Sequence, residues 1–79
     1  MDSETIKQLI EQGLPGATAL VDGDGRHFEA IVVCDDFAGK RLVQQHQMVY
    51  QTLAGHLHDD AVHALSLRTF TRAAWDQQR

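Results

Sequence analysis

The stretch of sequence that decides the fold is Asp22-Gly23-Asp24-Gly25-Arg26-His27-Phe28-Glu29-Ala30-Ile31-Val32-Val33-Cys34. It opens with two Asp-Gly pairs, which are typical of the tight turn of a β-hairpin. It ends in an apolar run on both faces of the pleat, which is typical of a central strand with cover on each side. We therefore predict a hairpin turn over residues 22–25 and a central strand from His27 to Cys34.

The residues before this stretch predict a helix and a first strand. Ser3 can cap a helix whose apolar residues repeat at helical spacing, and Gly13 supplies its end. The segment from Ala17 to Val21 is short and compatible with a strand, and it leads directly into the hairpin turn. A helix followed by a β-hairpin is therefore expected at the start of the fold.

The residues after the hairpin predict a helical crossover. From Arg41 onward, apolar residues beginning with Leu42 recur at helical spacing. The pattern ends between Gly55 and Asp60, so it fits one helix or two consecutive helices. A connection of this kind is right-handed if it leads to a parallel strand of the same sheet.

The last part of the chain predicts a third strand and a final helix. Alternation with a period of two runs from about His63 to Thr71, and Thr71 can cap a short helix that carries Trp75. The order of elements is then α-β-β-α-(α)-β-α. This order predicts an α+β sandwich in which helices cover a three-stranded mixed sheet.

Length and composition narrow the classes of protein. The chain has 79 residues, so we expect one domain over residues 1–79 with a small, efficient core. Its net charge of −4 weakens any general attraction to nucleic-acid phosphates. Its one cysteine, Cys34, excludes an internal disulfide, and no apolar run is long enough to span a bilayer. The start lacks the pattern of a signal peptide, so a cytoplasmic protein without membrane contact is expected.

Four ordered motifs resemble those of the BolA family. They are Asp24-Gly25-Arg26-His27-Phe28, Phe37-Ala38-Gly39-Lys40, Val49-Tyr50-Gln51-Thr52-Leu53 and Val62-His63-Ala64-Leu65-Ser66-Leu67. The short Asp-Gly-Asp-Gly turn is similar to that of the IbaG-like (YrbA-like) branch. The resemblance implies a BolA-like fold, which is similar to the class II KH domain. The chain departs from the family at Arg72, where proline is usual.

The resemblance implies a binding adaptor and no catalytic residues. In the family, the histidine that matches His63 is a ligand of a [2Fe–2S] cluster shared with a monothiol glutaredoxin and glutathione, in cluster trafficking or in iron and stress regulation. No cofactor is then expected in the isolated protein. From the residues alone, His63 also fits a strand-end histidine bonded to a backbone carbonyl, and His27 fits either a second metal ligand or a structural role.

The alternative function is a nucleic-acid-binding transcriptional regulator, which has been proposed for members of the family. Its candidate residues are Lys40, Arg41 and Gln44, at the start of the predicted crossover helix, and a solvated helix start fits them as well. DNA and a second copy of the chain are therefore possible partners beside glutaredoxin.

The remaining candidate side chains favour structural roles. Cys34 is expected to be buried and inert, and no base is placed beside it for nucleophilic catalysis. We expect His46 to be a partly buried imidazole with its hydrogen bonds satisfied, and His56 and His58 to be solvated at a helix end. No zinc-binding spacing occurs among the histidines.

Overall fold

The computed structural model describes residues 2–56 and 64–78 of the chain. Its elements are α1 (Ser3–Gly13), β1 (Thr18–Gly23), β2 (Phe28–Val33), the 3₁₀ helix η1 (Asp35–Phe37), α2 (Leu42–Leu53), β3 (Leu65–Phe70) and α4 (Arg72–Gln78). This order confirms the predicted α+β class, and a second crossover helix would fall on residues outside those described. None of the described helices is long and apolar enough to cross a bilayer.

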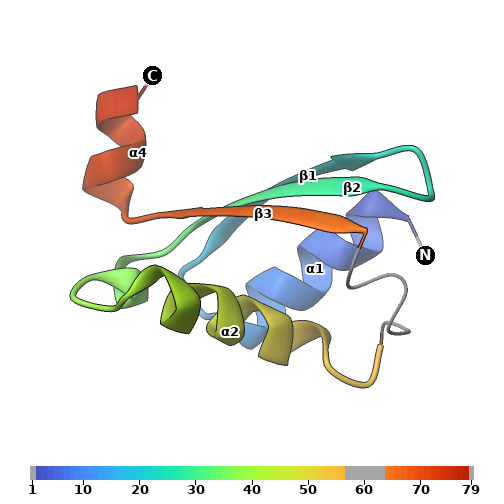
Figure 1. The fold of residues 1–79 in the computed structure, drawn as a ribbon, viewed down its shortest axis with the longest axis horizontal. Coiled ribbons are helices and arrows are strands. Elements are labelled where there is room, and N and C mark those ends of the chain that lie inside the picture. The colour runs from blue at the N-terminus through green and yellow to red at the C-terminus, as the bar shows by residue number, and fades with distance from the viewer. Residues whose placement is uncertain (1, 57–63, 79) are drawn as a thin grey trace.

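The strands form one mixed sheet in the order β1-β2-β3, so the prediction of a central second strand is confirmed. β1 pairs with β2 antiparallel, from Thr18 opposite Val33 to Gly23 opposite Phe28. β2 pairs with β3 parallel, and Phe28 lies opposite Leu65. The parallel pair is joined through α2, which lies on one side of the sheet (Figure 1).

The hairpin turn lies two residues later than predicted. β1 continues through Asp22 and Gly23, which we had assigned to the turn. The Asp24 carboxylate fixes the true turn, because its Oδ1 accepts hydrogen bonds from the backbone N–H groups of Arg26 and His27, both at 2.9 Å. The prediction was wrong because both Asp-Gly pairs have turn chemistry and only the second is needed.

The first helix is capped by Asp2, whereas the sequence analysis predicted Ser3. Asp2 has an extended backbone, and its Oδ1 accepts a hydrogen bond from the Thr5 N–H at 2.9 Å. This bond lowers the pKa of the Asp2 carboxyl below its ordinary value. Ser3 is the first helical residue, so the cap is one position earlier than the sequence suggested.

Helices α1 and α2 cover one face of the sheet, whereas α4 rises from the other side at one end (Figure 1). The buried side chains between the helices and the sheet form the core: Ile6, Ile10, Leu14, Ala19, Phe28, Ala30, Val32, Cys34, Phe37, Val49, Leu53 and Leu65. On the outer face, Ile31 is only half-buried. The prediction that β2 is covered on both sides was therefore wrong for most of the strand. The exception is Val33, which points to the outer face but is buried, and which lies opposite Phe70 of β3.

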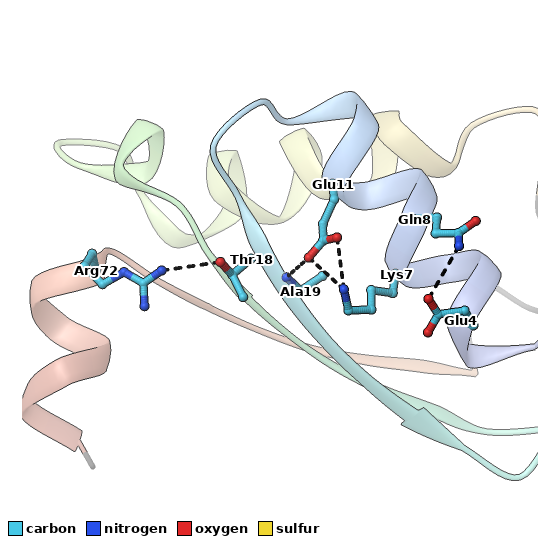
Figure 2. Close-up of polar contacts among 7 residues, drawn as sticks. All are labelled: Glu4, Lys7, Gln8, Glu11, Thr18, Ala19 and Arg72. Atoms are coloured by element: carbon cyan, nitrogen blue, oxygen red, sulfur yellow. Dashed lines mark hydrogen bonds and ion pairs between the residues drawn. The ribbon is translucent and has the colours of Figure 1, made fainter.

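Two polar links tie the edge strand β1 to helices α1 and α4 (Figure 2). Glu11 of α1 accepts the backbone N–H of Ala19 in β1 at 3.0 Å and pairs with Lys7 Nζ at 3.0 Å. The hydrogen bond from the Ala19 N–H, and then the contact with Lys7, lower the pKa of the Glu11 carboxyl below its ordinary value. At the start of α4, the guanidinium of Arg72 donates to Thr18 Oγ1 at 3.3 Å.

Arg72, which stands where proline is usual in the family, joins the start of α4 to η1. The backbone N–H of Arg72 donates to Asp35 Oδ1 at 3.1 Å, a bond that proline could not make. Thr71 caps α4 as predicted, since its Oγ1 accepts the N–H of Ala74 at 3.2 Å. The start of α4 is thereby joined to η1.

Candidate functional site

Of the two predicted metal ligands, His27 lies among the described residues and His63 lies outside them. His27 is exposed at the end of the β1–β2 turn. Its backbone is held on both sides, because its N–H donates to Asp24 Oδ1 and its carbonyl accepts the Asp24 N–H at 3.2 Å. The turn therefore presents the imidazole from a fixed backbone, and the metal roles of His27 and His63 stay predictions.

The surroundings of His27 are acidic. A shallow cavity of about 370 Å³ is lined there by Asp22, Gly23, Asp24, His27 and Glu29. The N–H groups of His27 and Arg26 lower the pKa of Asp24, so this carboxylate stays charged into the acid range. Within residues 2–56 and 64–78, no group of three or more histidine, cysteine, aspartate or glutamate side chains is arranged to hold a metal ion. The described side chains cannot enclose a metal by themselves.

The backbone joins the segment that carries His27 to the start of β3. The N–H of Phe28, the residue after His27, donates to the carbonyl of Ala64 at 2.9 Å. Ala64 is the residue after His63 in the sequence. Figure 1 shows the β1–β2 turn and the start of β3 at the same end of the sheet. Both candidate ligands are thus next to residues that are hydrogen-bonded to one another.

Cys34 lies at the other end of β2 and is part of the core. Its side chain is only 4% exposed, which confirms the predicted burial. Its backbone N–H donates to the Phe70 carbonyl at 2.9 Å, so it marks the end of the sheet away from His27. The thiol is therefore not a ligand candidate for a site on the surface.

The predicted nucleic-acid residues, Lys40, Arg41 and Gln44, are all exposed at the start of α2. Two of them have local structural roles. Lys40 Nζ donates to the Asp36 carbonyl at 2.8 Å, and Gln44 Oε1 accepts the backbone N–H of Arg41 at 2.9 Å. The structure thus brings the three residues together, but it uses the lysine and the glutamine to shape the loop and the helix start.

Two apolar side chains beside these residues were missed. Leu42 is 62% exposed and Val43 is 57% exposed, although the helical pattern placed Leu42 on the buried face. The prediction was wrong because burial along α2 begins at Val49, and the first turn projects beyond the part of the helix that lies in the core. Exposed apolar residues next to exposed cations form a mixed surface at the start of α2.

Gln45 holds this surface in place and was also missed. Its Nε2 donates to the carbonyls of Phe37 at 3.2 Å and Lys40 at 2.9 Å. Its Oε1 accepts the Thr69 hydroxyl at 2.6 Å. One side chain therefore fixes the loop before α2 to β3. A lone polar residue on a helix gives no sequence signal for such a role.

The other histidines behave only partly as predicted. His56 is exposed after the end of α2, as expected, and His58 lies outside the described residues. His46 is half-buried as expected, but its Nε2 is a buried atom without a hydrogen-bond partner among the residues described. The prediction of a satisfied imidazole was therefore wrong, because helical spacing gives burial and not the position of an acceptor.

Comparisons with known proteins agree with the architecture. Residues 7–74 match the family model of the BolA-like protein. The chain is 33% identical over all 79 of its residues to the acid stress protein IbaG of Escherichia coli K12, covering 94% of that protein. It is 43% identical over 54 residues, 68% of this chain and 50% of the relative, to the DNA-binding transcriptional regulator BolA of the same strain. The structure of a BolA homologue from Coxiella burnetii superposes with a TM-score of 0.85 at 40% identity, covering 96% of this chain and 97% of that one. This protein belongs to the BolA family.

Proposed function

We propose that the protein is a cytoplasmic adaptor that binds a monothiol glutaredoxin and shares a [2Fe–2S] cluster with it, in cluster trafficking or in iron and stress regulation. His63 supplies one imidazole ligand, and His27 is the candidate for a second. The observation that carries the proposal is the 2.9 Å hydrogen bond from the Phe28 N–H to the Ala64 carbonyl. It joins the immediate chain neighbours of the two histidines at one end of the sheet.

The set of available ligands supports a shared cluster. A [2Fe–2S] cluster takes four protein ligands or their equivalents, usually thiolates, with imidazole replacing thiolate in some clusters. The one thiol of this chain, Cys34, is buried in the core. The chain can therefore offer imidazoles, and the thiolates must come from the glutaredoxin cysteine and from glutathione. A bound cluster with mixed ligands would supply electron storage at a raised potential.

The charge around His27 indicates the kind of surface that docks there. Asp22, Asp24 and Glu29 are exposed and line the cavity beside this histidine. Charges of opposite sign across an interface speed encounter and fix orientation, and salt weakens their effect. We therefore expect the partner to present basic side chains to this turn. Replacing Asp22 by asparagine should slow association and reduce its dependence on salt.

The test is to reconstitute the complex anaerobically with a monothiol glutaredoxin, glutathione, iron and sulfide, and to record visible absorption and circular dichroism. The wild type should give a spectrum distinct from that of glutaredoxin alone. His63→Ala should abolish it, and His27→Ala will identify or exclude the second ligand. His56→Ala is the matched control, because this exposed histidine lies at the end of α2 and not at the turn.

The proposal is wrong if no cluster-bearing heterocomplex forms. It is also wrong if the spectrum is unchanged in both His63→Ala and His27→Ala. A loss of signal in His56→Ala as well would point to general destabilisation, which unfolding curves of the three variants would reveal.

A DNA-binding regulator is the alternative function. It is favoured by the exposure of Lys40 and Arg41 beside Gln44, and by the name of one relative, a DNA-binding transcriptional regulator. It predicts duplex binding that weakens steeply with salt and falls when Lys40 or Arg41 is changed to alanine. Absence of binding to duplex DNA at low salt would exclude it.

A further inference from the structure

The two edge strands of the sheet differ in what their outward backbone groups contact. β1 and β3 lie at the edges, with β2 between them. In a strand, the N–H and C=O groups of successive residues point alternately to one side and to the other, so every second residue of an edge strand turns its backbone groups away from the sheet. Such groups form a template on which a further strand can pair. Their contacts therefore decide which edge is available.

The edge of β1 is closed by carboxylates. Its outward N–H groups belong to Ala19, Val21 and Gly23, since the residues between them face β2. The Ala19 N–H donates to the Glu11 carboxylate at 3.0 Å, and the Gly23 N–H donates to Asp22 Oδ1 at 2.9 Å. Two of the three outward donors are therefore taken, and a further strand could pair with this edge only by displacing both carboxylates.

On β3 the outward residues follow from the pairing with β2. At the start of this pair, the Phe28 N–H donates to the Ala64 carbonyl at 2.9 Å. At its other end, the Cys34 N–H donates to the Phe70 carbonyl at 2.9 Å. The even-numbered residues of β3 therefore face β2. The residues that face outward are Leu65, Leu67 and Thr69.

These three outward residues leave the edge of β3 open. Their backbone N–H and C=O groups make no hydrogen bond with any part of residues 2–56 and 64–78. The parallel register with β2 is continuous from Leu65 to Phe70, so no bulge interrupts the strand. β3 also lacks proline and lysine, with which proteins commonly protect an edge, and Arg68 is its only charged residue. A regular open edge of this kind can accept another strand.

We propose that the open edge of β3 binds an extended acidic segment of a partner protein, which adds a fourth strand to the sheet. Adding a strand to a sheet edge is a common mode of peptide recognition, in which backbone hydrogen bonds give affinity and alternate side chains give specificity. The three outward residues of β3 each offer one N–H donor and one carbonyl acceptor to such a strand.

The side chains beside the open edge indicate the chemistry of that segment. On the outer face Arg68 is exposed, and its guanidinium lies 5.3 Å from the centre of the Phe70 ring, which holds the cation close to the edge. No carboxylate in the described part of the chain forms an ion pair with it. On the inner face Leu67 is only half-buried against the core. A segment that alternates acidic residues on the outer face with apolar residues on the inner face complements both side chains.

The test is amide hydrogen exchange of the full chain, followed residue by residue by nuclear magnetic resonance. The probe is an acetylated peptide of about eight residues that alternates valine and glutamate. In the free protein, the amides of Leu65, Leu67 and Thr69 should exchange quickly, and those of Ser66 and Arg68, which bond to β2, should exchange slowly.

The peptide should protect the outward amides of β3. We expect a dissociation constant of about 0.1–1 mM, because the segment gains backbone hydrogen bonds but fills no deep pocket. At about 5 mM peptide, exchange at the three outward amides should therefore slow about fivefold or more. The Val21 amide is the internal control, because it also points outward but lies between the two occupied donors of β1. Its exchange should be unchanged.

A charge reversal tests the acidic character of the partner. Arg68→Glu should weaken binding of the glutamate peptide by about tenfold and should favour the same peptide with lysine in place of glutamate. Arg26→Glu is the matched control, because it makes the same change of charge at an exposed position of the β1–β2 turn. Equal weakening by the two substitutions, or equal binding of both peptides to the wild type, would overturn the acidic partner.

Two results would overturn the proposal as a whole. One is exchange at the outward amides of β3 that about 5 mM peptide leaves unchanged. The other is protection of these amides in the free protein that increases with protein concentration. In that case a second copy of the chain occupies the edge, and the partner assigned to it is wrong.

Discussion

Replacing Gln45 by alanine should destabilise the domain more than any other change of an exposed or half-exposed polar residue on α2. The substitution removes hydrogen bonds to the carbonyls of Phe37 and Lys40 and from the hydroxyl of Thr69. Each such bond contributes about 0.5–1.5 kcal/mol net, and the one to Lys40 is exposed and easily replaced by water. We expect a loss of about 2 kcal/mol.

That loss is large for a chain of this size, whose free energy of unfolding should be about 4–12 kcal/mol. It corresponds to a fall in Tm of roughly 8–16 °C. The assay is urea unfolding followed by far-ultraviolet circular dichroism, together with thermal melting. Gln47→Ala is the matched control, since Gln47 is exposed on the same helix, and its effect should stay within about 0.5 kcal/mol.

A double-mutant cycle isolates the bond to β3. Thr69→Val removes the hydroxyl that donates to Gln45 at 2.6 Å and nearly keeps the side-chain shape. The Thr69→Val and Gln45→Ala double variant should be more stable than the sum of the single effects predicts, by about 1 kcal/mol. An effect of Gln45→Ala no larger than that of Gln47→Ala, with equal urea dependence, would refute the role assigned to this side chain.

Two further predictions concern the polar links of the sheet. Glu11→Gln should lower the free energy of unfolding by about 0.5–1 kcal/mol at neutral pH. Because folding lowers the pKa of the Glu11 carboxyl, its stabilising contribution is fully present above the ordinary glutamate pKa and is lost as the pH falls through the lower pKa of the folded state. The difference in stability between the variant and the wild type should therefore vanish in acid. A difference that persists in acid unfolding curves would contradict this. Asp35→Ala should lower the free energy of unfolding by about 0.5–1 kcal/mol in the wild type. It should have no effect in an Arg72→Pro background, because proline lacks the N–H that donates to Asp35. Equal effects in both backgrounds, measured by urea unfolding, would show that this hydrogen bond does not stabilise the fold.

The sequence predicts the parts of the fold that depend on periodicity. The central strand, the crossover helix and the helix after Thr71 follow from repeating apolar or alternating residues, and each is found. The hairpin turn was misplaced because two Asp-Gly pairs compete, and carboxylate geometry selects the second. Periodicity also cannot tell where a helix leaves the core, which is why Leu42 was assigned to the wrong surface.

Some features of the candidate site could be predicted from neighbouring residues in the sequence, whereas others depend on contacts between distant segments. His27 follows a turn that the sequence marks, so its exposure could have been predicted from the turn alone. Its relation to the start of β3 requires the parallel register of Phe28 with Leu65, which no local pattern contains. The role of Gln45 likewise depends on Thr69, 24 residues away in the sequence. Contacts of this kind appear only when the crossover has been folded onto the sheet.

The two proposed functions use opposite ends of the molecule. The β1–β2 turn and the start of β3 lie at one end of the sheet, and the start of α2 lies at the other (Figure 1). No hydrogen bond among the residues that the structure describes joins these two ends, and the core between them is continuous. Substitutions at distant sites without shared partners are usually independent. His27→Ala should therefore leave any DNA affinity unchanged, and Lys40→Ala should leave cluster binding unchanged. If either variant affected both activities, a single surface or a change of conformation would have to connect the two ends, and the adaptor and regulator functions would no longer be alternatives.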